Sequence, residues 1–324
     1  MINFASNISI NMETIKLNKS RSIKACIVDA WHLFALDWRK YLKFMAFPVL
    51  AAAMSGAFVF EMLLQYACQH LLPAYRLYQT GGDISWVQML LLPSWAELLL
   101  LAASLLLLLV FTSFYKGKLL GKIHDYSQAH AFADTVRINL TAKERSYAFK
   151  YGRGILFFLI FAGLFAALIT GASVKWQMRI LYLLPLVLMY FWTTGNVFRL
   201  QYTLGGNKFM TAIKNALRKS LGFVFIVQIL TIIPMLLLYA VFLLPACVYA
   251  LSVLAAEDSF LVGDHAVMPS YLPVLFFLIN TVGIAASMLF NSIRTWALVM
   301  KLNFFEESDN EQADVVEAEE TKLQ

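Results

Sequence analysis

Hydrophobic residues along this chain form long runs that are separated by polar segments. A helix needs about 20 apolar residues to cross a hydrocarbon core about 30 Å thick. The pattern therefore predicts membrane-spanning helices over 44–66, 94–115, 154–172, 180–198, 222–246 and 271–293. The predicted fold class is an all-α polytopic membrane protein with six transmembrane helices and additional amphipathic interfacial helices.

One apolar segment is longer than a single crossing requires. Residues 222–256 run for 35 residues without a charge, and as a straight helix they would reach about 50 Å. Pro234 and Pro245 interrupt this stretch, and each lacks a backbone N–H and crowds the preceding turn. We predict a kinked span followed by a short helix along the outer interface. The alternative is a seventh span, which would place the C-terminus outside.

The segment before the first span has the pattern of an amphipathic helix. Apolar residues recur at helical spacing on one stripe, namely Ile23, Ile27, Ala30, Trp31, Phe34, Trp38 and Tyr41. Because basic residues lie on the other side, we predict a cytoplasmic interfacial helix over 22–43. Its expected contacts with lipid headgroups are Trp31, Trp38, Arg39, Lys40 and Lys43. The alternative is that the stripe packs against the protein's own spans.

The composition agrees with a membrane protein and sets the two ends apart. The chain of 324 residues is 60% hydrophobic and only 14% charged, whereas a soluble domain is about a quarter charged. The last twenty residues carry eight acids and one lysine, so their net charge is −7. We predict a disordered N-terminus over 1–20, a membrane domain over 21–304 and an acidic disordered tail over 305–324.

The basic residues predict the orientation. The segments before the first span, between alternate spans (116–153 and 199–219) and after the last span hold 23 Lys and Arg residues. The other three loops hold three, which are Arg76, Lys175 and Arg179. The positive-inside rule then places both termini in the cytoplasm. No cleavable signal peptide is expected, so the first span should act as an uncleaved signal-anchor. We predict a multi-pass membrane protein, and the resemblance described below implies a bacterial inner membrane.

Two segments resemble each other and suggest a repeated architecture. "SIKACIVDAWHLFALDWRKYLKFMAFPVLAAA" begins at Ser22 and "AIKNALRKSLGFVFIVQILTIIPMLLLYA" begins at Ala212. Each opens with Ile-Lys, continues as a basic amphipathic helix and enters a span that contains one proline. A weaker third copy starts at Arg145. Three spans also end alike, with Thr112/Ser113 before Lys116, Thr193/Thr194 before Arg199 and Asn291/Ser292 before Arg294. We therefore expect three helical hairpins, each led by a cytoplasmic helix.

This pattern carries a family resemblance. A lead helix that runs through Asp-Trp-Arg-Lys (37–40) into a span, repeated in a six-span chain, resembles a group of bacterial inner-membrane proteins. The group includes the membrane domains attached to glycerophosphodiester phosphodiesterases. The resemblance implies only an architecture of uncertain function. No soluble phosphodiesterase domain is expected in this chain, so no catalytic residue is carried over.

Signatures of catalysis are absent from the sequence. It contains no GxxxxGK[ST], HExxH, GxSxG or GxGxxG motif, and its three cysteines have no metal-ligand spacing. We therefore predict no catalytic residue, no cofactor, no metal site and no nucleic-acid partner. The only candidate acids and bases are Glu61, His70, Asp264 and His265. A disulfide between Cys68 and Cys247, both on the predicted outer side, stays an open alternative.

Polar residues within the spans are the remaining candidates for a site. Glu61, Gln228 and Asn280 are expected to lie in the bundle, where amides commonly form hydrogen bonds between helices. Glu97 fits a capping box with Ser94 at the start of the second span. Gly152 and Gly154 are expected to bend the chain into the membrane.

Two functional hypotheses follow from these features. In the first, the protein is non-enzymatic and organises membrane lipids or a membrane-protein partner through its basic inner side and acidic tail. In the second, it is a transporter or lipid-translocation protein with a polar cavity near the proline-broken helices. The residues expected to line that cavity are Gln228, Asn280, Thr193 and Thr194.

Overall fold

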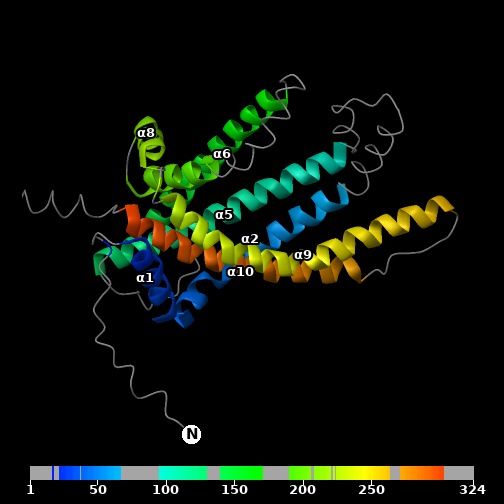
Figure 1. The fold of residues 1–324 in the computed structure, drawn as a ribbon, viewed down its shortest axis with the longest axis horizontal. Helices are drawn as coiled ribbons and strands as arrows, with labels where there is room; N and C mark the ends of the chain where they lie inside the picture. The colour runs from blue at the N-terminus through cyan, green and yellow to red at the C-terminus, as the bar shows by residue number, and fades with distance from the viewer. Residues whose placement is uncertain are drawn as a thin grey trace, which may run out of the picture.

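A computed structural model describes residues 17, 22–36, 38–66, 95–129, 139–170, 190–205, 208–219, 222, 224–262 and 271–302. The secondary structure of these residues is helical, which confirms the all-α fold class. The helices are α1 (Ile23–Leu36), α2 (Trp38–Tyr66), α5 (Trp95–Ala129), α6 (Ala142–Thr170), α8 (Phe209–Lys219), α9 (Phe225–Val262) and α10 (Leu272–Leu302), with a further helical segment over 190–203. The long helices run lengthwise beside one another, and α1 and α8 both lie at the same end of the molecule, on opposite sides of it (Figure 1).

Among the described residues, four helices are long and apolar enough to cross a membrane. They are Trp38–Tyr66, Trp95–Gln128, Phe225–Ser252 and Leu272–Leu302. The shortest has 28 residues and therefore a length of about 42 Å, which exceeds the hydrocarbon core. The chain is thus an α-helical membrane protein that crosses the bilayer several times. Residues 171–172 of the predicted third span and 180–189 of the predicted fourth span lie outside the described residues, so the number six stays a prediction.

The predicted interfacial helix over 22–43 was wrong as a single helix. The structure ends α1 at Leu36 and begins α2 at Trp38, so the basic residues from Arg39 onward belong to the first span. Asp37 has the residue type favoured before a helix start, because its carboxylate can bond free N–H groups there. The apolar spacing continues across this position and therefore gave no sign of the break.

The apolar stripe of α1 packs largely against the protein itself, as the alternative prediction stated. Cys26 and Ala30 are fully buried, and the Trp31 ring meets Phe290 of α10 edge-on at 5.7 Å between centroids. Trp31 and Trp38 nevertheless keep 43% and 47% of their surface exposed. The stripe therefore divides into a face that packs on α10 and two tryptophans at the surface.

The long apolar segment forms one helix rather than two. α9 is continuous over 38 residues with Pro234 and Pro245 inside it, so the predicted separate interfacial helix is not present over Phe225–Val262. A proline removes one N–H donor, and ending the helix in lipid would leave many more backbone groups unsatisfied. At about 57 Å, α9 reaches past the ends of α2, α5 and α10 (Figure 1).

Small residues allow close contact between α5 and α6. A Cβ at Gly117 would lie 2.6 Å from the Ala148 Cβ, and one at Gly121 would lie 2.5 Å from the Glu144 Cγ. Gly117 and Gly121 form a G-x-x-x-G pair, the spacing that brings membrane helices together. Glu144 also caps α6, because the Thr141 N–H donates to its Oε2 (2.7 Å) while the Glu144 N–H donates to Thr141 Oγ1 (3.2 Å).

The prediction that Gly152 and Gly154 bend the chain was also wrong. Both lie inside α6, which runs without interruption from Ala142 to Thr170. A Cβ at Gly152 would lie 2.8 Å from Ser113 Oγ, and one at Gly154 would lie 3.0 Å from Arg199 Cγ. These glycines therefore make room for side chains of neighbouring helices.

At the start of α5, Glu97 lies in the first turn, where the capping prediction requires it, whereas Ser94 lies outside the described residues.

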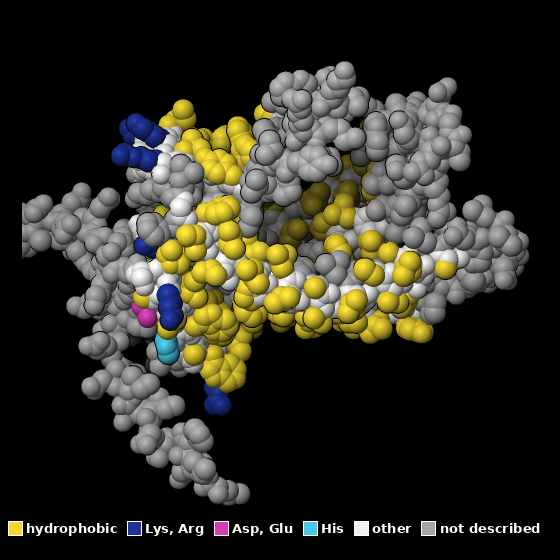
Figure 2. Space-filling model, in the orientation of Figure 1, with side chains coloured by type: hydrophobic (Ala, Val, Ile, Leu, Met, Phe, Trp, Pro, Cys, Tyr) yellow, Lys and Arg dark blue, Asp and Glu magenta, His cyan; other side chains and the backbone are white. Residues whose placement is uncertain are grey.

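The helix ends predicted to be cytoplasmic meet at one end of the molecule, which we call the basic end. The starts of α2, α6 and α9 and the ends of α5 and α10 lie there with α1 and α8 (Figure 1). Figure 2 shows Lys and Arg side chains at this end and hydrophobic side chains over most of the remaining described surface. Leu236, Leu237 and Val241 of α9 are examples of large exposed apolar residues that suit contact with lipid.

Candidate functional site: a buried basic cluster

Three basic side chains from three helices meet inside the basic end. Lys116 comes from α5, Arg199 from the helical segment 190–203 and Arg294 from α10. Lys116 is 4% exposed and Arg294 is 7% exposed, while Arg199 is partly buried. Lys116 lies close enough to both arginines for their like charges to repel it. We call Lys116, Arg199 and Arg294 the basic cluster.

Lys116 is held by one hydroxyl and two aromatic rings. Its Nζ donates a hydrogen bond of 2.7 Å to Thr295 Oγ1 of α10. The same Nζ lies 5.4 Å from the centre of the Tyr115 ring and 5.9 Å from that of Tyr151. A single hydrogen bond leaves most of the donor capacity of an ammonium group unused.

Arg294 is the least satisfied member of the basic cluster. Its guanidinium carbon lies 4.6 Å from the centre of the Trp192 ring, and its Nη2 donates to Asn291 Oδ1. Its Nε and Nη1 are buried and have no hydrogen-bond partner within the described residues. An arginine normally presents five N–H donors, so these two nitrogens leave a buried face of the guanidinium without an acceptor.

Arg199 connects the basic cluster to a buried amide pair. Its Nε donates to the Gly195 carbonyl oxygen (2.9 Å), and its Nη2 donates to Asn196 Oδ1 (3.0 Å). The Asn196 Nδ2 in turn donates to Gln228 Oε1 of α9 at 3.3 Å. The Arg199 guanidinium also lies 5.4 Å from the centre of the Tyr151 ring. Tyr151 of α6 therefore has both Arg199 and Lys116 over its ring.

A second polar group lies next to Lys116. The Tyr115 hydroxyl lies 2.6 Å from the Met288 carbonyl oxygen, to which it donates, and 2.6 Å from Ser292 Oγ. The Tyr41 hydroxyl is buried near Ser292 but has no hydrogen-bond partner among the residues that are described. Buried donors without an acceptor in the described residues are therefore found on α2, at Tyr41, as well as on α10, at Arg294.

The electrostatics of the basic cluster are unbalanced. In the described part of the chain, the partners of its three members are hydroxyl, amide, carbonyl and aromatic groups and include no carboxylate. Removing a cation from water costs several kcal/mol, whereas a desolvated cation–π contact contributes about 2 kcal/mol. Two buried basic groups and one partly buried basic group therefore lack a counter-charge within the described residues. This arrangement suits a bound anion, and basic pockets between membrane helices typically receive lipid headgroups.

The structure joins only one of the predicted site residues to this cluster. Gln228 is fully buried and bonded to Asn196, and its Nε2 lies 3.5 Å from the Thr193 carbonyl oxygen. Asn280 is buried on α10, where its Nδ2 has no partner among the described residues. Glu61 is partly buried on α2, and no hydrogen bond or ion pair is found for it in the described part of the chain.

The predicted lipid-contact residues lie on the surface of the basic end. Trp31, Trp38, Arg39, Lys40 and Lys43 are all exposed. The Arg39 guanidinium stacks over the Trp38 ring at 5.4 Å. These five residues do not belong to the basic cluster. The sequence pattern marked Lys116, Arg199 and Arg294 only as basic residues that follow a polar pair at the end of a predicted span. Their equivalent positions could have predicted the cluster, because the ends of spans that face the same side of the membrane lie at the same depth in it.

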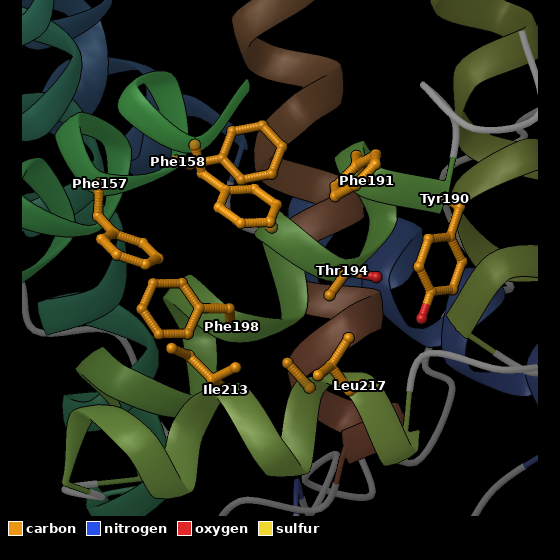
Figure 3. Close-up of a pocket in the computed structure, with 11 residues that line it drawn as sticks. Phe157, Phe158, Tyr190, Phe191, Thr194, Phe198, Ile213 and Leu217 are labelled. Atoms are coloured by element: carbon orange, nitrogen blue, oxygen red, sulfur yellow. The ribbon is translucent and has the colours of Figure 1, made fainter. Parts of the chain in front are cut away.

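An apolar cavity of about 170 Å³ lies beside Arg199. In Figure 3 the rings of Phe157, Phe158, Phe191 and Phe198 surround it, and Ile213 and Leu217 close it from α8. Thr194 also lines the cavity, and its hydroxyl is buried without a hydrogen-bond partner in the described residues. The cavity is therefore aromatic, unlike the polar cavity predicted around Gln228 and Asn280.

Most residues of the predicted outer loops lie outside the described residues. His70, Asp264, His265 and Cys68 lie outside the described residues, while Cys247 is exposed on α9. Within the part of the chain that is described, no three His, Cys, Asp or Glu side chains are grouped as a metal site would require.

Comparisons of this chain with protein-family models, with curated proteins and with solved structures find no match. The resemblance to phosphodiesterase-linked membrane domains therefore stays a prediction.

Proposed function

We propose that this protein is a non-enzymatic membrane component that organises anionic lipids by holding their phosphate groups in the basic cluster. The observation that carries the proposal is that Lys116 and Arg294 are buried, and Arg199 partly buried, without a carboxylate partner in the described residues. In this proposal the basic end faces the cytoplasm of a bacterial inner membrane, and both termini lie on that side.

Binding at this position would organise the protein as well as the lipid. A phosphate between the three side chains would neutralise repulsion between α5, α10 and the segment 190–203. Arginine suits this role because its planar fork binds phosphate oxygens bidentately. Around the cluster, exposed Trp38, Arg39 and Lys43 would hold further anionic lipids at the surface.

A membrane-protein partner is the second form of the organising hypothesis. The tail over 305–324 carries a net charge of −7, which suits a basic partner surface. The same tail could also supply an anion to the basic cluster. Removing the tail therefore distinguishes a lipid ligand from an intramolecular one.

A transport or lipid-translocation function is the second candidate. The specific observation in its favour is the cavity that adjoins Arg199, together with the unpartnered Nδ2 of Asn280 on α10. This candidate requires lipid movement between leaflets, whereas the organising function requires only retention. Reconstitution with fluorescent lipids in both leaflets separates the two: accelerated exchange between leaflets supports translocation, and unchanged exchange supports retention.

The test of the proposed function is mass spectrometry on the full chain extracted with its native lipids. We compare the wild type with a double variant, Lys116→Gln with Arg294→Met, and with the surface control Lys24→Gln with Arg145→Gln, which changes two exposed residues of α1 and α6. Anionic lipids should co-purify with the wild type and the surface control and fall at least fivefold in the cluster variant.

Three results would change the conclusion. Equal lipid retention in the cluster variant would overturn the assignment of the headgroup site. Lipid that appears only after residues 306–324 are deleted would show that the tail normally fills the cluster. A stoichiometric protein that is lost with the tail, without enriched lipid, would replace the lipid ligand by a protein partner.

A further inference from the structure

We infer that the ligand is a lipid with a phosphate monoester headgroup, and that one of its hydrocarbon chains occupies the aromatic cavity beside Arg199. This inference rests on the proposed function and adds the ligand's headgroup class and the position of its chain.

The charge of the basic cluster selects the headgroup. A bound anion favours the protonated form of Lys116, so Lys116, Arg199 and Arg294 then carry three positive charges together. They have no carboxylate partner in the described residues. A phosphate diester brings one negative charge, whereas a phosphate monoester brings about 1.5 to 2 at pH 7. The monoester also has three terminal oxygens, which can accept from several donors at once. It therefore balances the three cations more completely than a diester does.

The unused donors point to the same headgroup. Nε and Nη1 of Arg294 are buried and unpartnered in the described residues, and a guanidinium can offer two such N–H groups in parallel to a phosphate. Within the described residues, the Lys116 ammonium has one hydrogen bond, to Thr295 Oγ1, so it can donate two more. The cluster thus combines a fork-shaped donor and a point charge on two different helices, both of which need oxygen acceptors.

The cavity is connected to the basic cluster through shared residues. Phe158 lines the cavity, and the Arg199 guanidinium lies 5.7 Å from the centre of its ring. Gly195 also lines the cavity, and its carbonyl oxygen accepts the hydrogen bond from Arg199 Nε at 2.9 Å. A molecule whose phosphate contacts Arg199 therefore has its apolar part next to the cavity.

The size and walls of the cavity suit a segment of hydrocarbon chain. Apolar protein cavities of about 150 Å³ stay dry and take up molecules as large as benzene, and this cavity has about 170 Å³. It can thus hold part of an acyl or isoprenoid chain, with the remainder in the bilayer. The α8 wall is anchored by Phe209, whose ring lies 4.7 Å from that of Phe157 and 5.3 Å from that of Phe198.

The test measures headgroup preference and chain binding separately. The full chain in nanodiscs of zwitterionic lipid is titrated with dioleoyl phosphatidate or dioleoyl phosphatidylglycerol, and bound lipid is counted by native mass spectrometry. The two probes share their chains and differ in carrying a monoester or a diester. We expect the wild type to bind phosphatidate at least fivefold more tightly, and Arg294→Met to remove this preference.

The cavity is tested with Ile213→Trp, which fills it from α8, and with Met210→Trp as the control, because Met210 is an exposed residue of the same helix. Ile213→Trp should weaken both probes at least fivefold and keep their ratio, whereas Met210→Trp should change neither. Leu217→Trp, at a more exposed position of the cavity wall, provides the same measurement if Ile213→Trp does not fold.

Each failure has a distinct meaning. Equal binding of the two probes by the wild type would overturn the monoester assignment. Identical behaviour of the Ile213 and Met210 variants would overturn the placement of the chain. If the wild type retains neither probe, the proposed function itself is wrong.

Discussion

Arg294 is held in place by the Trp192 ring and the Asn291 amide, yet two of its guanidinium nitrogens lack an acceptor in the described residues. A residue that served only to stabilise the fold would have little reason to keep this imbalance, because an apolar side chain of similar size would pack there at lower cost. Sites that bind ligands commonly retain such locally unfavourable groups, at some loss of stability.

Replacing this arginine should therefore stabilise the protein when no anionic lipid is present. We expect Arg294→Met, which keeps much of the packing against Trp192, to raise the free energy of unfolding by about 1 to 3 kcal/mol in neutral nanodiscs. The physical reason is the removal of a buried charge that repels Lys116. Thermal unfolding of both proteins in zwitterionic lipid measures the difference.

Added anionic lipid should reverse the order of the two proteins. A ligand that binds only the folded state raises its stability by mass action, so the wild type gains while Arg294→Met gains little. Exchanging the exposed Arg145 of α6 for Met serves as the control and should leave both measurements nearly unchanged. A loss of stability in Arg294→Met without lipid would instead assign Arg294 a structural role.

At the scale of helices, hydrophobic periodicity predicted where apolar segments lie but not always where helices end. The stripe from Ile23 to Tyr41 keeps helical spacing across the break between Leu36 and Trp38, so only the aspartate at 37 marked it. The opposite error occurred in α9, where Pro234 lies inside a continuous helix. A proline in the sequence indicates a possible break. It does not show that backbone N–H and C=O groups in lipid must keep their hydrogen bonds, which favours a continuous helix.

The contact between α5 and α6 makes a prediction at this scale. Gly117→Ala should destabilise the protein by about 1 to 3 kcal/mol, because the new Cβ would lie 2.6 Å from the Ala148 Cβ and 2.7 Å from the Glu144 carbonyl oxygen. Backbone at such a distance can yield only if the two helices separate. Unfolding of the reconstituted variant by heat or denaturant measures the loss.

Gly56→Ala is the matched control on α2. Both substitutions gain the same intrinsic helix propensity, about 1 kcal/mol, but the Cβ at Gly56 meets a flexible side chain, with Ile284 Cδ1 at 3.3 Å. Gly56→Ala should therefore be neutral or stabilising. Combining Gly117→Ala with Ala148→Gly should recover part of the lost stability, since the shortest contact is removed while the Glu144 oxygen (2.7 Å) and the Cα of residue 148 (2.9 Å) remain in the way. Equal effects of the two alanine substitutions would show that α5 and α6 do not pack as closely as described.

On the scale of the whole molecule, the sequence contained the positions of the basic cluster but not its convergence. Lys116, Arg199 and Arg294 each follow a polar pair at the end of a predicted span, so their common depth could be inferred. Which of the many basic residues turn inward depends on how the helices rotate and pack. Lys43 ends up exposed on α2, for example, whereas Lys116 is buried on α5. When a helix is apolar on most sides, its sequence pattern does not indicate how the helix is rotated about its own axis.

The arrangement of the basic end leads to a prediction about threading. α1 and α8 lie at the same end (Figure 1), so residues on them should be accessible from the same side of the membrane. Between them the chain must then cross an even number of times. α2 and α5 provide two crossings, and the predicted spans over 154–172 and 180–198 would provide two more.

Single cysteines in a cysteine-free background test this directly. Lys24→Cys on α1 and Arg218→Cys on α8 should react with a membrane-impermeant maleimide only in inverted vesicles, because the basic end should face the cytoplasm. Trp95→Cys, at the exposed start of α5, should react only in intact cells whose outer membrane has been made permeable to the maleimide. Reaction of Lys24→Cys and Arg218→Cys from opposite sides would mean that one of the two middle spans does not cross. Reaction of both from the outer side would keep the six-span fold but invert it, and the basic cluster would then face anionic groups outside the cell.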